Sequence, residues 1–265
     1  MGTTAKALSL LDHFSRARPA IGLSELARLA GHSKATCYRL MGELIDHGLA
    51  EQVPGGTDYR IGPAVLRLAS LREAAVPMRD AALPVVQRLA VAVGETAHVS
   101  HLVAGRLVTL AFAYGAPSGM QVLMEDADVL PFHATSSGQA VLAFLPHARV
   151  DAILAGPLGA ATPATLRDPD VVRARIAATR ARGWASTEDT FESDVSSLAV
   201  PLFDAAGQVL GAMAVAAPST RMKQAARGPI LRRLVAAAAE VMGAWGGQAP
   251  AELIALWRGI ERDQG

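Results

Sequence analysis

The sequence predicts an α+β protein made of two parts, and three observations lead to this prediction. The first 61 residues place three short helical segments ahead of a pair of strands. The remainder alternates strands and helices, an order typical of a domain with an antiparallel sheet. The chain has 265 residues, 51% of them hydrophobic and 18% charged, so it is long enough for two domains and too apolar for disorder.

The first two helices are predicted from the spacing of apolar residues. Such residues recur at helical intervals over residues 3–16. This helix is expected to end before Pro19, because the residue preceding a proline avoids helical backbone angles. A second helix is expected over Leu23–Ala30, with Ser24 as its N-cap.

A third helix and a β-hairpin are expected after a tight turn. Ser33 is a suitable N-cap for a helix that runs to about His47, where Gly48 stops it. Strands are expected over Leu49–Val53 and Asp58–Ile61, because a Gly-rich turn separates them. The predicted order of the first part is therefore helix, helix, turn, helix and hairpin.

The second part is expected to follow a linker helix, whose wide apolar arc requires a partner surface. The predicted domains span residues 1–61, 62–77 for the linker, 78–247, and 248–265 for a helical tail. The elements expected beyond the linker are helices over 79–93, 137–145, 147–155, 168–182, 223–245 and 252–262, and strands over 95–103, 106–113, 196–203 and 208–217.

Composition excludes several classes of protein. Cys37 is the only cysteine, so neither a disulfide framework nor a zinc site with several thiolates is expected. The longest uncharged apolar stretches, such as Val209–Ala217, are shorter than the ~18 residues that span a bilayer. The first twenty residues lack the apolar core of a signal peptide. We therefore expect a cytoplasmic protein with no membrane partner.

The sequence contains no pattern of residues that predicts an enzyme. Ser136–Gly138 lacks the Gly-x-Ser-x-Gly pattern of a nucleophile elbow. His98 and His101 lie three residues apart on a predicted strand, so they face opposite sides and are not expected to share a metal ion. His133 is expected to be a hydrogen-bonded structural histidine. No catalytic residue, metal or cofactor is expected.

The third helix has the two faces that a DNA-recognition helix needs. On a helical wheel, Leu40, Met41 and Leu44 gather near Cys37 and are expected in the core. The opposite face carries Arg39, which can bond both acceptors of a guanine edge. The residues predicted to contact DNA are Ser33, Lys34, Ala35, Thr36, Tyr38, Arg39 and, on the hairpin, Arg60.

Bulk charge does not predict DNA binding. The first 60 residues hold seven Lys or Arg and six Asp or Glu, so geometry must place the few cations. The alternative is a small three-helix domain whose polar face is merely solvated. The order of the elements favours DNA binding over this alternative.

Several segments resemble the IclR family of bacterial transcriptional regulators. The segments that carry the resemblance are Leu23–Ala27, Lys34–Leu40, Glu43–Leu49, Gly94–Ala97, Pro131–Gly138, Arg182–Trp184 and Ala199–Asp204. The resemblance implies a winged helix-turn-helix followed by a GAF-like effector-binding domain. It also implies a homodimer or homotetramer that binds double-stranded operator DNA and a small-molecule effector.

In this family the ligand lies between the sheet and the loop and helix segments on one side. The amides after His133 suit a carboxylate, although Ser137 can equally be an ordinary N-cap. Where the family has more polar residues or a lysine, this chain has alanines on the last strand and Gln139, so a less polar pocket is expected. The predicted effector-binding residues are Met120, Val122, Ser136, Ser137, Gly138, Thr187, Ser197, Ala214 and Ala216.

The predicted function is a ligand-responsive repressor of a catabolic operon. Its effector is expected to be a small organic acid or derivative with an apolar, for example aromatic, body. The alternative from another class is a small-molecule-metabolising enzyme with an N-terminal oligomerisation module. A third is a ligand-sensing adaptor that binds a protein through its first part.

Overall fold

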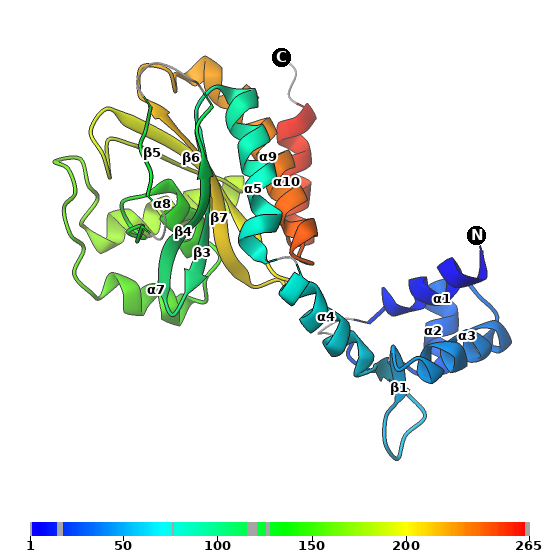
Figure 1. Cartoon of the computed structure of the whole chain (residues 1–265). Helices are drawn as coiled ribbons and strands as arrows, with labels where there is room; N and C mark the ends of the chain where they lie inside the picture. Colours follow the sequence, from blue (N-terminus) through cyan, green and yellow to red (C-terminus); the bar gives the residue numbers. More distant parts are fainter. Residues whose placement is uncertain (1, 15–17, 76, 116–120, 126–127, 263–265) are drawn as a thin grey trace. The chain divides into compact units, whose positions relative to one another are not determined.

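The structure, a computed structural model, describes residues 2–14, 18–75, 77–115, 121–125 and 128–262 (Figure 1). It divides into two compact units, Met1–Pro77 and Met78–Gly265. Secondary structure is mixed and the larger sheet is antiparallel, which confirms the predicted α+β class. Among the described residues, no helix is long and apolar enough to cross a membrane.

The first unit consists of three helices, a two-stranded antiparallel hairpin and a fourth helix. Leu10, Leu26 and Leu40, one from each of the first three helices, are fully buried together and form the centre of its core. The elements are α1 (Thr3–Leu11), α2 (Leu23–Ala30), α3 (Lys34–Asp46), β1 (Ala50–Gln52), β2 (Tyr59–Ile61) and α4 (Ala64–Ala75).

The first helix is shorter than predicted. α1 ends at Leu11 rather than near residue 16, and the next amides bond three residues back in tighter turns. Phe14 nevertheless packs against the core. The apolar spacing therefore marks burial beyond the point where the helix ends.

The predicted Ser24 cap is wrong. α2 begins after Gly22, its N-cap, so Ser24 lies inside the first turn. The cause is tertiary: Ile21 and Tyr59 exchange two backbone hydrogen bonds of 2.9 Å in an isolated β-bridge. This bridge holds the chain extended up to Gly22, so the helix starts immediately after it.

The second unit is a five-stranded antiparallel sheet with helices on both faces. The strand order is β4-β3-β7-β6-β5, with α5, α9 and α10 on one side and α6 to α8 on the other (Figure 1). The elements are α5 (Met78–Val93), β3 (Thr96–Val103), β4 (Arg106–Ala113), α6 (Ser136–Leu142), α7 (His147–Leu154), α8 (Pro169–Arg182), β5 (Ala185–Glu188), β6 (Val195–Phe203), β7 (Val209–Pro218), α9 (Gln224–Ala244) and α10 (Ala251–Arg262).

The start and the length of α6 differ from prediction. Thr135, not Ser137, is the N-cap, because the Thr135 Oγ1 accepts a 3.0 Å hydrogen bond from the amide of Gly138. The helix ends at Leu142 rather than at residue 145, shortly before Pro146 forces an extended turn. Since Thr135 caps the helix, the Ser137 hydroxyl is not needed for this role and bonds elsewhere.

The sequence does not predict the edge strand β5. Its residues, Ala-Ser-Thr-Glu, show no alternation of apolar and polar side chains. The strand forms because its backbone pairs antiparallel with β6, in a register that sets Thr187 opposite Ser197. Tertiary pairing therefore brings together two residues that local pattern could not connect.

Candidate functional site

The start of α3 is built as the sequence predicts. The Ser33 Oγ accepts a 3.2 Å hydrogen bond from the amide of Thr36 and lies 2.9 Å from the Thr36 hydroxyl. Cys37, Leu40 and Met41 face the core and are buried, which raises the pKa of the Cys37 thiol. The predicted Ser33 cap and the small core role of Cys37 are confirmed.

The opposite face of α3 is open to solvent. Lys34, Ala35, Tyr38 and Arg39 are exposed, with 65% of Tyr38 accessible, and Thr36 is half-buried. Within the part of the chain that the structure describes, neither Lys34 nor Arg39 forms an ion pair. This face can therefore approach another molecule without first breaking intramolecular contacts.

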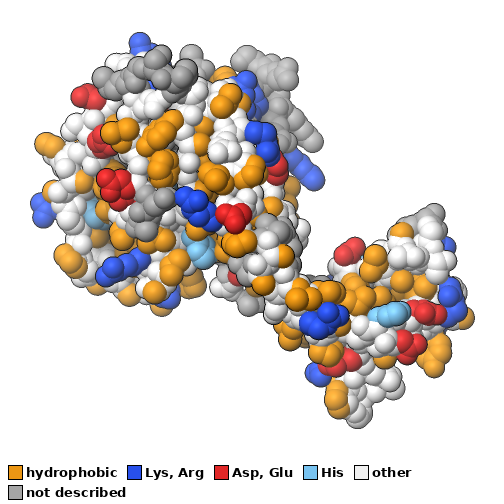
Figure 2. Space-filling model, viewed as in Figure 1, with side chains coloured by type: hydrophobic (Ala, Val, Ile, Leu, Met, Phe, Trp, Pro, Cys, Tyr) orange, Lys and Arg blue, Asp and Glu red, His pale blue; other side chains and the backbone are white. Residues whose placement is uncertain are grey.

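The predicted wing cation is already engaged within the hairpin. The Arg60 Nε on β2 donates a 2.6 Å hydrogen bond to the Glu51 carboxylate on β1, and both side chains are partly exposed. To contact a phosphate, the Arg60 guanidinium would have to bind it together with Glu51 or first release Glu51. On the face of the first unit seen in Figure 2, acidic and basic side chains are interspersed.

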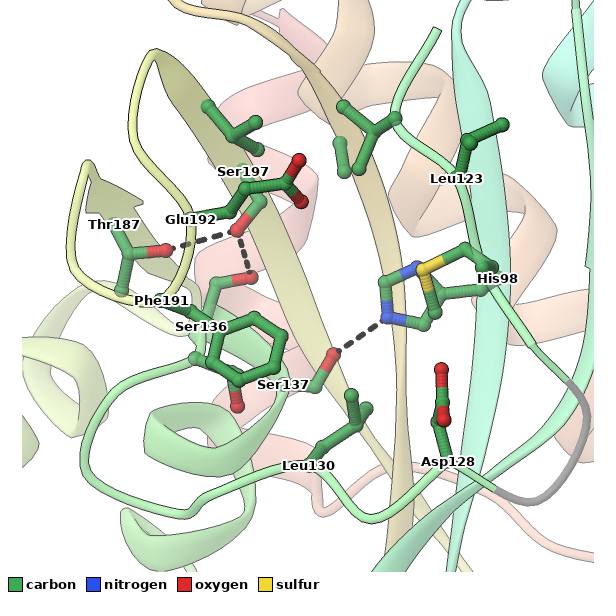
Figure 3. Close-up of a pocket in the computed structure, with 15 residues that line it drawn as sticks. His98, Leu123, Asp128, Leu130, Ser136, Ser137, Thr187, Phe191, Glu192 and Ser197 are labelled. Carbon is green, nitrogen blue, oxygen red and sulfur yellow. Dashed lines mark hydrogen bonds between the residues drawn. The ribbon is translucent and has the colours of Figure 1, made fainter. Parts of the chain in front are cut away.

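The second unit contains a cavity beside the sheet (Figure 3), with about 580 Å³ of empty space, part of it open to solvent. Six residues predicted from the sequence line it: Val122, Ser136, Ser137, Thr187, Ser197 and Ala216. The other lining residues, which the sequence did not indicate as effector contacts, are His98, Leu123, Met124, Asp128, Leu130, Thr135, Phe191, Glu192 and Val195.

Three hydroxyl groups form a chain along one wall of this cavity. The Thr187 and Ser197 hydroxyls are 2.9 Å apart, and the Ser197 hydroxyl donates to the Ser136 Oγ at 2.7 Å (Figure 3). Each hydroxyl has one proton. Because Ser136 accepts from Ser197, its own proton is available to an acceptor in the cavity.

His98 forms the opposite wall and is neutral at pH 7. Its side chain is 5% exposed, and burial lowers its pKa to about 4. The Nε2 atom lies 3.1 Å from the Ser137 hydroxyl, whereas the buried Nδ1 has no hydrogen-bond partner in the described part of the chain. An unpaired buried nitrogen is costly, so a ligand or a water molecule is expected to satisfy it.

The charged residues of this cavity are acidic. Asp128 lies on the His98 side, and Glu192 lies near Ser197 (Figure 3). One Asp128 oxygen accepts a 3.1 Å hydrogen bond from the Glu125 amide. No Lys or Arg is among the described residues that line the cavity, so an anionic ligand group must be held by hydroxyl and amide donors.

Of the other three predicted effector residues, Gly138 and Ala214 do not line the cavity, and the position of Met120 is not described. Met120 lies outside the described residues. Ala214 is fully covered in the core below the cavity. Gly138 serves packing, because a Cβ there would come within 2.4 Å of the backbone of Phe132.

The histidines behave as the sequence predicts. His98 faces the cavity, whereas the ring of His101 packs edge-on against the ring of Trp245, with 6.4 Å between the ring centres. The two histidines therefore do not meet. His133 Nε2 lies 2.9 Å from the carbonyl oxygen of Gly159, a structural contact. In the described residues, no three His, Cys, Asp or Glu side chains come together in a way that could hold a metal ion.

Comparison with known proteins adds an independent line of support. A family model described as the IclR helix-turn-helix domain matches residues 3–54, and one described as the bacterial transcriptional regulator IclR C-terminal matches residues 73–242. A solved structure described as an ICLR transcriptional regulator, from Silicibacter sp. TM1040, is 48% identical with a TM-score of 0.88. The match covers 95% of this chain and 99% of that one.

Two further relatives are known by the regulon that one regulates and by the ligand bound in the other. The Pca regulon regulatory protein of Pseudomonas putida is 27% identical over 236 residues, which cover 89% of this chain and 79% of the relative. An IclR homolog from Microbacterium hydrocarbonoxydans, solved in complex with 4-hydroxybenzoate, is 25% identical with a TM-score of 0.58. That match covers 92% of this chain and 99% of the homolog.

Proposed function

Because this chain belongs to the IclR family of transcriptional regulators, we propose that it represses a catabolic operon until a small-molecule effector fills its cavity. The chain is a regulator and not an enzyme, since both family models describe transcriptional regulators. The alternative of a metabolic enzyme with an oligomerisation module therefore has no support. A DNA-binding regulator must reach the chromosome, so the cytoplasm is its expected location.

The observation that carries the DNA-binding proposal is the exposed polar face of α3. Arg39 and Tyr38 project from a helix whose other side is locked into the core by Leu40 and Met41. A rigid helix with an exposed guanidinium fits the requirements of major-groove readout. Residues Ser33 to Thr36 at its start offer amide and hydroxyl groups for a phosphate.

Fluorescence polarisation with the promoter region that flanks its own gene tests this proposal. We expect saturable binding that an unrelated duplex of equal length competes for only weakly. Equal affinity for both duplexes would contradict operator recognition. No binding to any duplex, with or without effector, would favour the adaptor function instead.

Replacing Lys34 with alanine is expected to weaken binding to all duplexes alike. A lysine beside the start of α3 is suited to a phosphate, which carries charge but no sequence information. The slope of log affinity against log salt should therefore flatten by about one unit. Polarisation titrations at several salt concentrations measure this slope. The matched control is Lys6→Ala on α1. An equal change of the slope in both variants would contradict a specific role for Lys34.

We propose that the effector has an apolar body and one hydrogen-bond-accepting end, as in an aromatic acid or its derivative. Val122, Leu130 and Phe191 supply apolar surface, and the Ser136 hydroxyl offers a donor at the end of its chain. One relative points the same way, since it was solved with 4-hydroxybenzoate. Asp128, on the acidic side of the cavity, would accept a hydrogen bond from a hydroxyl group of the ligand.

Replacing Ser136 with alanine is expected to weaken binding of an aromatic acid by roughly 10- to 150-fold. A hydrogen bond to a charged group is worth about 1.5–3 kcal/mol, and the variant loses the terminal donor. Calorimetry with a panel of aromatic acids against glyoxylate and pyruvate measures it. The matched control is Ser196→Ala, since Ser196 bonds Ser219 and does not line the cavity.

Two outcomes would contradict the effector proposal. One is binding of the short oxo acids alone, because they lack an apolar body. The other is an unchanged affinity of an aromatic acid in the Ser136→Ala variant.

We further propose that the protein acts as a homodimer or homotetramer. Leu66, Leu68 and Leu71 on α4 are 74%, 47% and 57% exposed in the single chain, an apolar surface that a second copy would cover. Two linked recognition helices read two half-sites and gain affinity from linkage. The effector needs to change the free energy of operator binding by only ~1–3 kcal/mol to act as a switch.

A further inference from the structure

A second cavity in the same unit has a different chemical character from the effector cavity. It spans about 470 Å³ of empty space, part of it open to solvent, between α6, α8, β5 and the start of α9. Ligand cavities are usually lined by apolar side chains, but here Leu166 is the one apolar residue among the described lining. The polar lining residues are Gln139, Arg175, Ser186, Thr187, Glu188, Thr190 and Arg227.

Positive charge in and beside this cavity exceeds negative charge. Arg175 and Arg227 line it, and Glu188 is the one carboxylate in its described lining. The Arg227 Nη2 donates to the Glu188 carboxylate at 3.2 Å. Arg175, in contrast, forms no ion pair within the described residues.

A third guanidinium, that of Arg182, adds to this excess. Burial, together with the charges of Arg175 and Arg227, lowers its pKa. Its hydrogen bonds go to neutral acceptors, the Trp184 carbonyl at 2.7 Å and the Ser186 hydroxyl at 3.2 Å. The guanidinium also stacks on the Trp184 ring, 3.9 Å from its centre, so it is held in position.

We propose that this cavity is a binding site for a small phosphate monoester, separate from the effector site. Two guanidinium groups against one carboxylate in the described lining leave a positive charge that an anionic ligand balances. Guanidinium forks match the oxygens of a phosphate, which can accept several charge-assisted hydrogen bonds at once. Because the Ser186 hydroxyl accepts from Arg182, its proton can be donated to a ligand oxygen.

The polar lining also specifies the body of the ligand. A cavity of this size, with side chains such as Gln139, Ser186 and Thr187 around it, suits a hydroxylated body about as large as a sugar. An aromatic body would leave these groups without partners. The two cavities therefore select different ligands.

The two sites share one wall. Thr187 lines both cavities, and its hydroxyl bonds Ser197, the middle member of the hydroxyl chain in the effector cavity. A ligand that bonds Thr187 from the arginine side changes the hydrogen bonding on the effector side. Occupation of the phosphate site consequently alters effector affinity.

Calorimetry on the full-length protein with ribose 5-phosphate, at constant ionic strength, tests the proposal. We expect saturable binding of ribose 5-phosphate, none of ribose, and weaker binding of inorganic phosphate. Arg175→Gln should weaken ribose 5-phosphate binding at least about tenfold, the usual worth of a charge-assisted hydrogen bond. Arg227→Gln should do the same.

The matched control is Arg173→Gln, which removes the same charge from the same helix. Arg173 pairs with Asp151 and does not line this cavity. The affinity of the Arg173→Gln variant for ribose 5-phosphate should therefore stay within about twofold of that of the unaltered chain. Melting curves confirm that each variant is folded, and Arg175 is exposed, so its replacement leaves the core intact.

Four results would overturn the proposal. They are no binding of ribose 5-phosphate by folded protein, an affinity in the Arg175→Gln and Arg227→Gln variants unchanged from that of the unaltered chain, a loss in Arg173→Gln as large as in these two variants, and tighter binding of the dicarboxylate succinate. None of these results concerns operator or aromatic-acid binding. Failure of the phosphate site is therefore distinguishable from failure of the proposed regulatory function.

Discussion

Replacing Arg39 with alanine is expected to remove most of the sequence-specific affinity for operator DNA. The side chain projects from α3 with no ion pair in the described part of the chain, so its guanidinium is free to bond a base edge. A good bidentate base contact is worth ~1–3 kcal/mol, or roughly 5- to 150-fold in the dissociation constant. Polarisation titrations on the operator and on a scrambled duplex measure it.

Comparing the loss of affinity on the operator with the loss on the scrambled duplex distinguishes a contact with a base from a general effect of positive charge. Arg39→Ala should relax the preference between the two duplexes, because the variant still contacts phosphates through other groups. Arg28→Ala removes the same charge from the exposed face of α2, where Arg28 lies 3.8 Å from Glu25, and should change little. Unchanged specificity in Arg39→Ala would rule out α3 as the recognition helix proposed above.

Replacing Gly138 with alanine is expected to destabilise the second unit by about 1–3 kcal/mol, the usual effect of overpacking a core. A Cβ at this position would lie 2.4 Å from both the Cα and the carbonyl oxygen of Phe132, and backbone atoms cannot swing aside. α6 would have to move, and it carries Ser136 and Ser137. Effector affinity should therefore fall together with stability.

Urea denaturation measures this effect, with Gly243→Ala as the matched control. Gly243 lies inside α9 with nothing within 4 Å of an added Cβ, so alanine there should stabilise the helix by up to about 1 kcal/mol. Equal midpoints for the two variants would contradict the close approach of α6 to Phe132.

Part of the candidate ligand site could be predicted because its residues lie in recognisable local segments. Ser136 and Ser137 lie in a run that resembles the family, and Thr187 and Ser197 occupy positions where this chain departs from the residues common in the family. Phe191 and Glu192 lie between β5 and β6, where no periodicity marks a residue as lining a cavity. The spacing of His98 and His101 predicts only that they face opposite sides of the sheet, and the buried position of His98 opposite the hydroxyl chain appears only in the folded sheet.

Local chemistry was sufficient to predict that the helices and hairpins form, and that α3 has one buried and one exposed face. Capping hydroxyls, glycines with left-handed angles such as Gly48 and Gly183, and apolar spacing act within a few residues, so they can be recognised without a fold.

The tertiary structure decided everything that depends on distant partners. It formed the edge strand β5, fixed the start of α2 through the bridge between Ile21 and Tyr59, and formed two cavities on either side of Thr187. It also gathered Arg175, Arg182 and Arg227 from two helices. Such arrangements arise from backbone pairing and packing between segments far apart in the chain, and no local pattern encodes the distance between them.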